Sequence, residues 1–262
     1  MIELPVFPIV ADSLGLPFKY LPELVKYGGV PFLLMLVVSA ISFLLAREDA
    51  SKNEMSALMA VAHVVLFTPF SVTWSKLAIY GRPAIATDPP FAYSRTQWLY
   101  LLATTLMMIS LVIIAGPSVA LVRYGQRNFD HEVVMWGGVL MVAGLVLFAI
   151  GFVRLTFVFP AIAIRKYAGI SAAWQQTRGN IERLAAIIVL SSAPYYVIRQ
   201  ILDSLIGYHP PGLAAAARGS LDMLLIAMAT TALAGPALAY KRIVLDEPEE
   251  APALGGATPS RE

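Results

Sequence analysis

The residues best suited to chemistry form small groups, and none of them makes up a known catalytic set. Asp130, His131 and Glu132 are adjacent, and clustered histidine and carboxylate groups can bind a metal or relay protons. Because no further ligand follows at the spacing of a metal site, we interpret this run as a solvated turn whose acids open the next helix. His63 stands alone in an apolar segment, where a hydrogen bond between helices is the simpler role.

Two arginine–aspartate pairs near the end of the chain share the spacing of one helical turn. The pairs are Arg199 with Asp203 and Arg218 with Asp222. Their two segments would form a hairpin, so all four side chains could meet in one polar cluster. Charges inside a membrane are costly and are usually paired or functional. Two interpretations follow: ion pairs that join the two helices, which we favour, or a polar vestibule for a substrate.

No motif of an enzyme class or a cofactor site accompanies these groups. The chain has no cysteine, which excludes disulfides and thiolate metal sites. It also lacks the metalloprotease, phosphate-loop and serine-hydrolase signatures. We therefore expect no catalytic site, no metal and no cofactor. The net charge of +2 is too small to suggest binding to nucleic acid.

The elements that must position these residues are long apolar helices. Hydrophobic residues make up 58% of the chain and charged residues 14%, against about 25% charged in soluble domains. A helix of about 20 apolar residues crosses a bilayer core, and backbone groups within lipid must pair internally. The sequence therefore predicts an all-α, polytopic membrane protein with six transmembrane helices. The six segments are Gly29–Ala46, Met55–Ile79, Trp98–Val122, Val133–Phe157, Leu184–Ile206 and Ala214–Tyr240.

The two ends of the chain differ from the transmembrane domain, which we place at residues 29–242. Residues 1–28 form a cytoplasmic or interfacial lead-in, where 7–26 make either a short interfacial helix or a loosely ordered approach. They lack the pattern of a cleavable signal peptide, so we expect the first span to act as a signal anchor. Residues 243–262 are rich in Pro, Glu, Ala and Gly, which is typical of a disordered tail.

Lysine and arginine are distributed unequally between the two ends of the predicted spans. Those on the side of the N-terminus outnumber those on the opposite side by two to one. Basic residues are enriched in cytoplasmic loops. The sequence therefore predicts that both termini, and the tail, are cytoplasmic.

Segments that join a proline to a cation recur at the ends of three predicted spans. The runs that begin at Pro69, Pro160 and Pro236 each reach lysine or arginine within about two turns. Proline removes one backbone hydrogen bond and bends a helix. Two interpretations stay open. The runs are either marks of three hairpins derived from one repeated unit, or ordinary proline bends beside cationic cytoplasmic ends.

The most distinctive run lies between the fourth and fifth predicted spans. Gly169 would break the chain, Ser171 would cap a short helix over residues 172–178, and Gly179 would end it; Asn180 would cap the fifth span. We expect this amphipathic helix to lie in the head-group layer, with its tryptophan in lipid and basic residues facing anionic head groups. The candidate residues for binding lipid or a partner are Arg154, Arg165, Lys166, Trp174, Arg178 and Arg183.

This stretch resembles the membrane domain associated with some glycerophosphoryl diester phosphodiesterases, and the uncharacterised bacterial inner-membrane proteins similar to it. Trp74–Gly81 resembles a further motif of related proteobacterial proteins, which usually reads Trp-His-Arg; Ser75 and Lys76 depart from it. The resemblance implies a bacterial inner-membrane location. It does not imply phosphodiesterase activity, which belongs to a separate soluble domain. The matching residues of the first stretch are Arg154, Thr156, Pro160, Ala161, Ala163, Ser171, Trp174, Thr177, Arg178, Gly179 and Asn180.

Two functions from different classes suit such a chain. The first is a non-enzymatic membrane module that binds inner-leaflet phospholipids, with anionic head groups as the candidate class, or scaffolds a protein partner at the cytoplasmic face. The second is a small transporter, suggested by prolines in or beside every span and by the repeats. Because the span centres have almost no ionisable residues that could couple an ion gradient, we predict the first.

Overall fold

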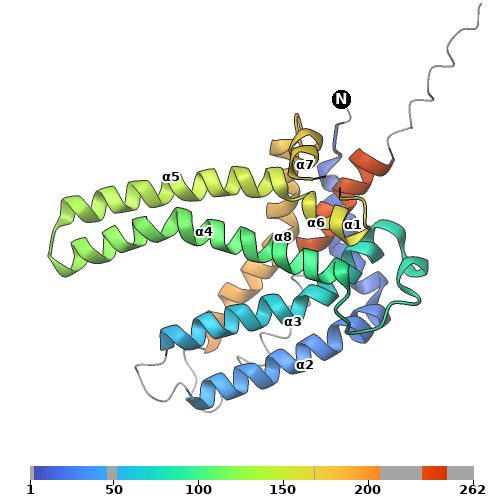
Figure 1. Cartoon of the computed structure of the whole chain (residues 1–262), viewed down its shortest axis with the longest axis horizontal. Helices are drawn as coiled ribbons and strands as arrows, with labels where there is room; N and C mark the ends of the chain where they lie inside the picture. The colour runs from blue at the N-terminus through green and yellow to red at the C-terminus, as the bar shows by residue number, and fades with distance from the viewer. Residues whose placement is uncertain (1–2, 46–51, 168, 207–231, 247–262) are drawn as a thin grey trace, which may run out of the picture.

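The computed structural model describes residues 3–45, 52–167, 169–206 and 232–246, and these contain helices and no strand (Figure 1). The predicted all-α class is confirmed for this part of the chain. The helices are α1 (Val6–Lys19), α2 (Leu21–Leu45), α3 (Lys52–Tyr80), α4 (Arg95–Arg127), α5 (His131–Leu155), α6 (Val158–Ala163), α7 (Ile170–Gln176) and α8 (Ile181–Ile206). A short 3₁₀ helix η2 (Arg82–Ile85) follows α3, and a helix over 232–240 continues into a short π-helix η3 (Lys241–Leu245).

Within the described residues, three helices are long and apolar enough to cross a bilayer. They are Arg95–Arg127, the joined stretch His131–Ala163, and Ile181–Ile201 in α8. These correspond to the third, fourth and fifth predicted spans, and they are compatible with a membrane-embedded protein. The first predicted span overlaps α2, which begins earlier, and the second lies within α3. The sixth is described only from residue 232 onwards. A total of six spans stays a prediction.

Side-chain caps set the starts of α4 and α5. Ser94 Oγ accepts a hydrogen bond from the N–H of Thr96 at 3.3 Å, and Gln97 Oε1 accepts one from the N–H of Ser94 at 3.0 Å. Together these bonds form a capping box, which satisfies backbone donors that a helix start leaves unpaired. Asp130 Oδ1 accepts from the second and third N–H groups of α5, both at 3.1 Å. The acid of the predicted turn is therefore a helix cap.

Two prolines interrupt their helices in different ways. Pro160 cannot donate to the carbonyl four residues earlier, and the chain leaves the α-helical conformation at Thr156 and Phe157, between α5 and α6. Pro69 lies inside α3, which stays continuous. There the Tyr93 hydroxyl donates to the carbonyl of Val65, the group that Pro69 leaves without a helical donor. The bend predicted at each proline is therefore a break in the helix before Pro160, whereas at Pro69 the helix is continuous and the Tyr93 hydroxyl replaces the missing donor.

The helices α2 and α3 form one pair and α4 and α5 another, and the two pairs diverge from one densely packed end (Figure 1). We call this end the junction: α1, the last turns of α3, the break between α5 and α6, α6, α7, the start of α8, and residues 232–246. Phe157 and Tyr240 are 0% and 1% exposed there and pack edge to face, with ring centroids 5.4 Å apart. Trp74 is also buried and stacks on Phe70 at 5.5 Å.

The long α4–α5 hairpin that leaves the junction packs through small residues. A Cβ atom added to Gly137 would lie 2.8 Å from Val122 Cγ2, and one added to Gly144 would lie 3.0 Å from Ile114 Cγ2. The neighbouring Gly138 has open space instead. Glycines at such positions let the two backbones approach closely, which is the usual basis of helix packing in membranes.

The N-terminal segment forms part of the junction. It forms α1, which packs against α8, and after a break at Tyr20 the chain continues as α2. The backbone N–H of Leu4 donates to Asn180 Oδ1 at 3.3 Å, and its carbonyl accepts from Arg183 Nη1 at 3.2 Å. Glu3 Oε2 lies 2.8 Å from Arg183 Nη2. The start of α8 is therefore tied to the beginning of the chain.

Candidate functional site

The site lies around α7, and it is held together by a contact between Arg154 and Trp174. The Arg154 guanidinium carbon lies 4.9 Å from the centroid of the Trp174 ring, and Arg154 Nη1 donates to the Trp174 carbonyl at 3.2 Å. Thr177 Oγ1 lies 3.3 Å from the Arg154 carbonyl, at the last turn of α5, where helical carbonyls lack donors. Arg154 thus orients α7 and its tryptophan from the end of α5.

One face of α7 is apolar and exposed. Ile170 and Trp174 are 59% and 46% exposed and lie one helical turn apart, whereas Ala173 is buried against the protein. Exposed large apolar side chains on a short amphipathic helix suit contact with lipid or with a partner. α7 begins two residues earlier than predicted, because the left-handed Gly169 (φ +102°) precedes it in place of a Ser171 cap.

The cations beside α7 are presented by a strained turn. Arg165 has a φ of +60°, a left-handed conformation that costs a non-glycine residue roughly 1–2 kcal/mol. The N–H of Arg165 donates to the Ile162 carbonyl at 3.0 Å, and that of Lys166 donates to the Ala161 carbonyl at 2.9 Å. This is the Schellman pattern that ends many helices, with arginine at the position that glycine usually takes.

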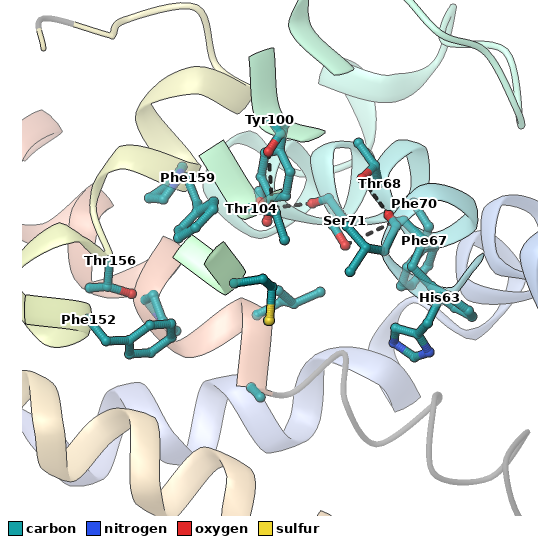
Figure 2. A pocket seen from close by; sticks show the side chains of 17 residues that line it. His63, Phe67, Thr68, Phe70, Ser71, Tyr100, Thr104, Phe152, Thr156 and Phe159 are labelled. Atoms are coloured by element: carbon teal, nitrogen blue, oxygen red, sulfur yellow. Dashed lines mark hydrogen bonds between the residues drawn. The ribbon is translucent and has the colours of Figure 1, made fainter. Parts of the chain in front are cut away.

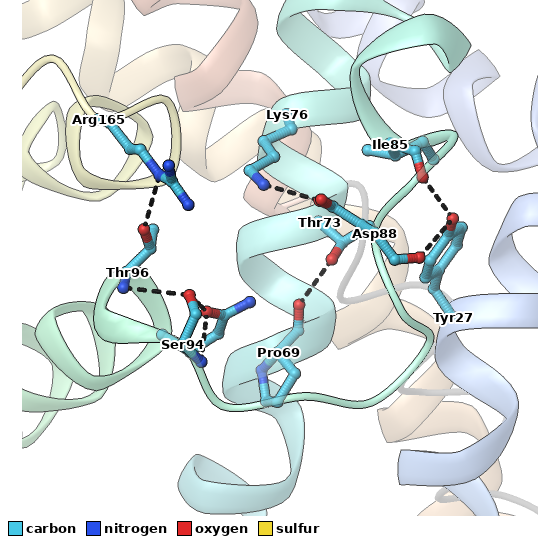
Figure 3. Close-up of polar contacts among 10 residues, drawn as sticks. Tyr27, Pro69, Thr73, Lys76, Ile85, Asp88, Ser94, Thr96 and Arg165 are labelled. Atoms are coloured by element: carbon cyan, nitrogen blue, oxygen red, sulfur yellow. Dashed lines mark hydrogen bonds and ion pairs between the residues drawn. The ribbon is translucent and has the colours of Figure 1, made fainter.

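Three cations of this turn and helix end are open to the surroundings. Arg165, Lys166 and Arg178 are exposed, and none of them forms an ion pair within the described residues. Arg165 Nε donates to Thr96 Oγ1 at 3.2 Å (Figure 3), which holds its guanidinium near the start of α4. We call the described residues between 165 and 178 the α7 shelf.

An apolar groove of about 300 Å³ opens beside the α7 shelf, between α4 and α6. Tyr167 and Ile170 of the α7 shelf line part of this groove, and Tyr167 directly follows Lys166 in the sequence. Exposed positive charge thus lies next to an apolar groove. This arrangement is complementary to an anionic phospholipid, whose negative head group is joined to apolar chains. The remaining lining residues are Leu99, Leu102, Ala103, Leu106, Met107, Ser110, Leu155, Val158, Phe159 and Ile162.

The loop between α3 and α4 is pinned near the shelf by polar contacts (Figure 3). Lys76 Nζ lies 2.7 Å from Asp88 Oδ2, and the Tyr27 hydroxyl donates to the Ile85 carbonyl at 2.6 Å. Arg82 Nε lies 2.6 Å from Glu23 Oε1. Lys76, one of the two departures from the Trp-His-Arg motif, therefore has a structural ion pair.

The other predicted site residues lie elsewhere. Arg183 is engaged with Glu3 and Leu4 and so supports the N-terminal segment. Arg199 Nη1 contacts the Tyr195 hydroxyl at 3.4 Å. Arg218, Asp222 and the side chain of Asp203 lie outside the described part, so the predicted polar cluster is not tested. Within the described residues no group of three His, Cys, Asp or Glu side chains could hold a metal ion.

A second cavity, which sequence reasoning missed, lies between α3, α4 and the α5–α6 break (Figure 2). Its volume is about 290 Å³. Hydroxyl groups line it at Thr68, Ser71, Ser75, Tyr100, Thr104 and Thr156. The spacing of Ser71 and Ser75 by one helical turn in an apolar segment was the signal that could have indicated it.

The fold and these sites define a helical protein with helices that can cross a membrane and a basic, partly apolar shelf at their packed end. No protein-family model, curated protein or solved structure matches this chain.

Proposed function

We propose that this chain is a non-enzymatic, six-span protein of the bacterial inner membrane that binds anionic phospholipid at the α7 shelf. In this proposal the shelf and both termini face the cytoplasm. Phosphate oxygens would lie against the exposed cations, and one acyl chain would occupy the groove between α4 and α6.

The observation that carries the proposal is the turn at Arg165. A strained backbone in a functional region is retained only where its surroundings determine it. Here the left-handed Arg165 and the next residue, Lys166, directly precede Tyr167, which lines the apolar groove. Glycine at this position would end α6 without strain, so the arginine contributes its side chain at some cost in stability.

Two further features support lipid over a soluble ligand. Ile170 and Trp174 are exposed on one face of α7, next to the same cations, and an aromatic residue beside basic ones is typical of the membrane interface. The resemblance of this stretch to bacterial inner-membrane proteins agrees with the location. A protein partner that binds the same cations is the competing occupant.

Native mass spectrometry of the purified protein with added phosphatidylglycerol or phosphatidylcholine tests the proposal. Each cation near anionic lipid contributes about 1 kcal/mol. Arg165→Gln with Lys166→Gln should therefore lower the preference for phosphatidylglycerol by roughly 30-fold. Arg123→Gln with Arg127→Gln, which removes the same charge from exposed positions at the far end of α4, is the matched control and should change it little. An equal preference in both double variants would overturn the proposal and leave a protein partner as the occupant.

A small transporter is the second candidate, and the hydroxyl-lined cavity of Figure 2 favours it. A transporter needs a site near the middle of the membrane, and proline-interrupted helices often supply one. Among the described residues that line the cavity, however, none is an acid, a lysine or an arginine. The groups that usually couple transport to an ion gradient are thus missing from this lining, and the lipid-binding module remains the better-supported function.

A further inference from the structure

We propose that the cavity between α3, α4 and the α5–α6 break binds a neutral single-chain lipid with a hydroxyl-bearing head, of the monoacylglycerol class. This site is separate from the α7 shelf and does not depend on the function proposed for it. The head would form a hydrogen bond with Thr156, and the chain would pass the aromatic residues of the cavity.

The first argument is a hydroxyl group without a partner. Four other hydroxyl residues of this lining donate to the carbonyl four residues earlier in their own helix: Thr68, Ser71, Ser75 and Thr104, at 2.7 to 3.0 Å. Thr156 is 2% exposed, yet its hydroxyl forms no hydrogen bond with any described residue. It lies at the break before Pro160, outside the regular helix in which such a bond would form.

The Thr156 hydroxyl is not one of the fully buried atoms without a partner. Because Thr156 lines the cavity, a ligand there can form a hydrogen bond with this hydroxyl. Figure 2 shows Thr156 beside Phe152 and Phe159 on one side of the cavity, with His63 and Phe67 on the other. Tyr100 is buried near Ser71 and Ser75, whose oxygens can accept from its hydroxyl. Thr156 is therefore the hydroxyl of this lining that is open to a ligand.

The lining also selects against charge. Its described residues include no acid, lysine or arginine, and only His63 is titratable near neutral pH. A carboxylate, phosphate or amine would enter without a counter-ion, which is strongly unfavourable in a site of this kind. The ligand should therefore carry a neutral polar head.

The size and walls of the cavity indicate a lipid tail. A volume of about 290 Å³ holds a body about as large as ten water molecules at ~30 Å³ each. That is enough for a glycerol head and the first part of a chain. The aromatic side chains Phe67, Phe70, Phe152 and Phe159 line the rest. His63 at the opposite side is exposed, so a longer chain can leave the cavity there.

Binding of three probes to the detergent-solubilised protein tests the inference: monoolein, oleate at pH 8, and hexadecane. These share an apolar chain and differ in having a neutral hydroxyl head, a charged head or no head. We expect monoolein to be retained in native mass spectrometry and to raise the unfolding temperature, with at least tenfold weaker binding of the other two. Similar binding of all three would overturn the inference.

Two variants test where the head group of the ligand binds. Thr156→Val removes the open hydroxyl with little change in volume and should weaken monoolein binding about tenfold. Thr104→Val is the matched control, because its hydroxyl lines the same cavity but is already bonded to the Tyr100 carbonyl. If Thr156→Val folds poorly, Phe152→Trp, which fills the cavity from the adjacent turn, should abolish binding. Unchanged monoolein binding in Thr156→Val and in Phe152→Trp would contradict the proposed site. The Arg165 and Lys166 double variant should bind monoolein normally, which separates this site from the α7 shelf.

Discussion

The junction and the far part of the α4–α5 hairpin contain similar apolar residues in opposite surroundings. In the junction, large side chains such as Phe157 and Tyr240 are almost fully buried within the protein. Only 6% of the residues are buried in the most apolar segment of α4, and the same share is buried in that of the joined α5–α6 stretch. The hairpin side chains face outward, where lipid can accept apolar surface that water would reject.

This difference shows where the chain specifies its tertiary structure. Lipid solvates an exposed leucine nearly as well as a protein core does, so most large residues of the hairpin contribute little to helix packing. Small residues at the α4–α5 contact carry that role. In the junction, large side chains and long-range polar contacts carry it instead, and the shelf and the cavity lie at or beside this end.

A cavity made in the junction should therefore cause the largest loss of stability. Phe157→Ala removes a fully buried ring that packs on Tyr240 and should lower the free energy of unfolding by about 3–5 kcal/mol. Leu147→Ala, at a highly exposed position of α5, should change it by less than about 0.5 kcal/mol. Unfolding by increasing SDS in mixed micelles, followed by circular dichroism, measures both. Comparable losses in the two variants would mean that the hairpin is packed as tightly as the junction.

A smaller effect should come from crowding the hairpin contact. Gly137→Ala places a methyl group 2.8 Å from Val122 Cγ2 and 3.0 Å from the Val122 backbone nitrogen, and should cost about 1–3 kcal/mol. Gly138→Ala, one residue further, meets open space and should leave stability unchanged or slightly raise it. The same unfolding measurement applies.

A second-site change sharpens this test. Val122→Ala removes the side-chain part of the clash but not the backbone part, so it should restore only some of the loss caused by Gly137→Ala. Full restoration, or equal effects of alanine at the two glycines, would contradict the packing role assigned to Gly137.

The hairpin was the part of the fold that the sequence could predict best. Its spans follow from apolar length, and its starts follow from local caps at Ser94 and Asp130, which act within one helical turn. The junction depends on contacts that no local pattern indicates. The Leu4 amide and the Asn180 side chain are 176 positions apart, and Tyr27 reaches Ile85 over 58 positions.

The candidate site likewise has parts that local sequence patterns predict and parts that depend on long-range contacts. The presence of a short helix after the fourth span follows from glycines and amphipathic spacing, and Gly179 has the left-handed φ of +82° expected of a helix stop. Its contact with Arg154 joins residues twenty positions apart across a broken helix, and the strained Arg165 occupies a place where the sequence rule expects glycine. Side-chain partners of this kind depend on tertiary packing, which residue spacing alone does not specify.

The smallest effect on stability should come from Arg154, which links the α4–α5 hairpin to the junction. It lies at the end of α5 and holds α7 in the shelf. Arg154→Met keeps most of the side-chain volume but removes the cation over the Trp174 ring and the bond to its carbonyl. Contacts of these two kinds contribute about 1 kcal/mol each. Amide hydrogen exchange across α7 should become about five- to thirtyfold faster. The free energy of unfolding of the whole protein should change by at most about 1 kcal/mol.

Arg183→Met is the matched control, since it removes an arginine from the same end of the molecule but one that binds Glu3 and Leu4. It should speed exchange in α1 and leave α7 protected. Slow exchange of α7 in Arg154→Met would mean that the short helix is held by its buried Ala173 and Thr177 alone. The arginine would then not position Trp174, and the shelf would be a rigid part of the junction rather than a separately held surface.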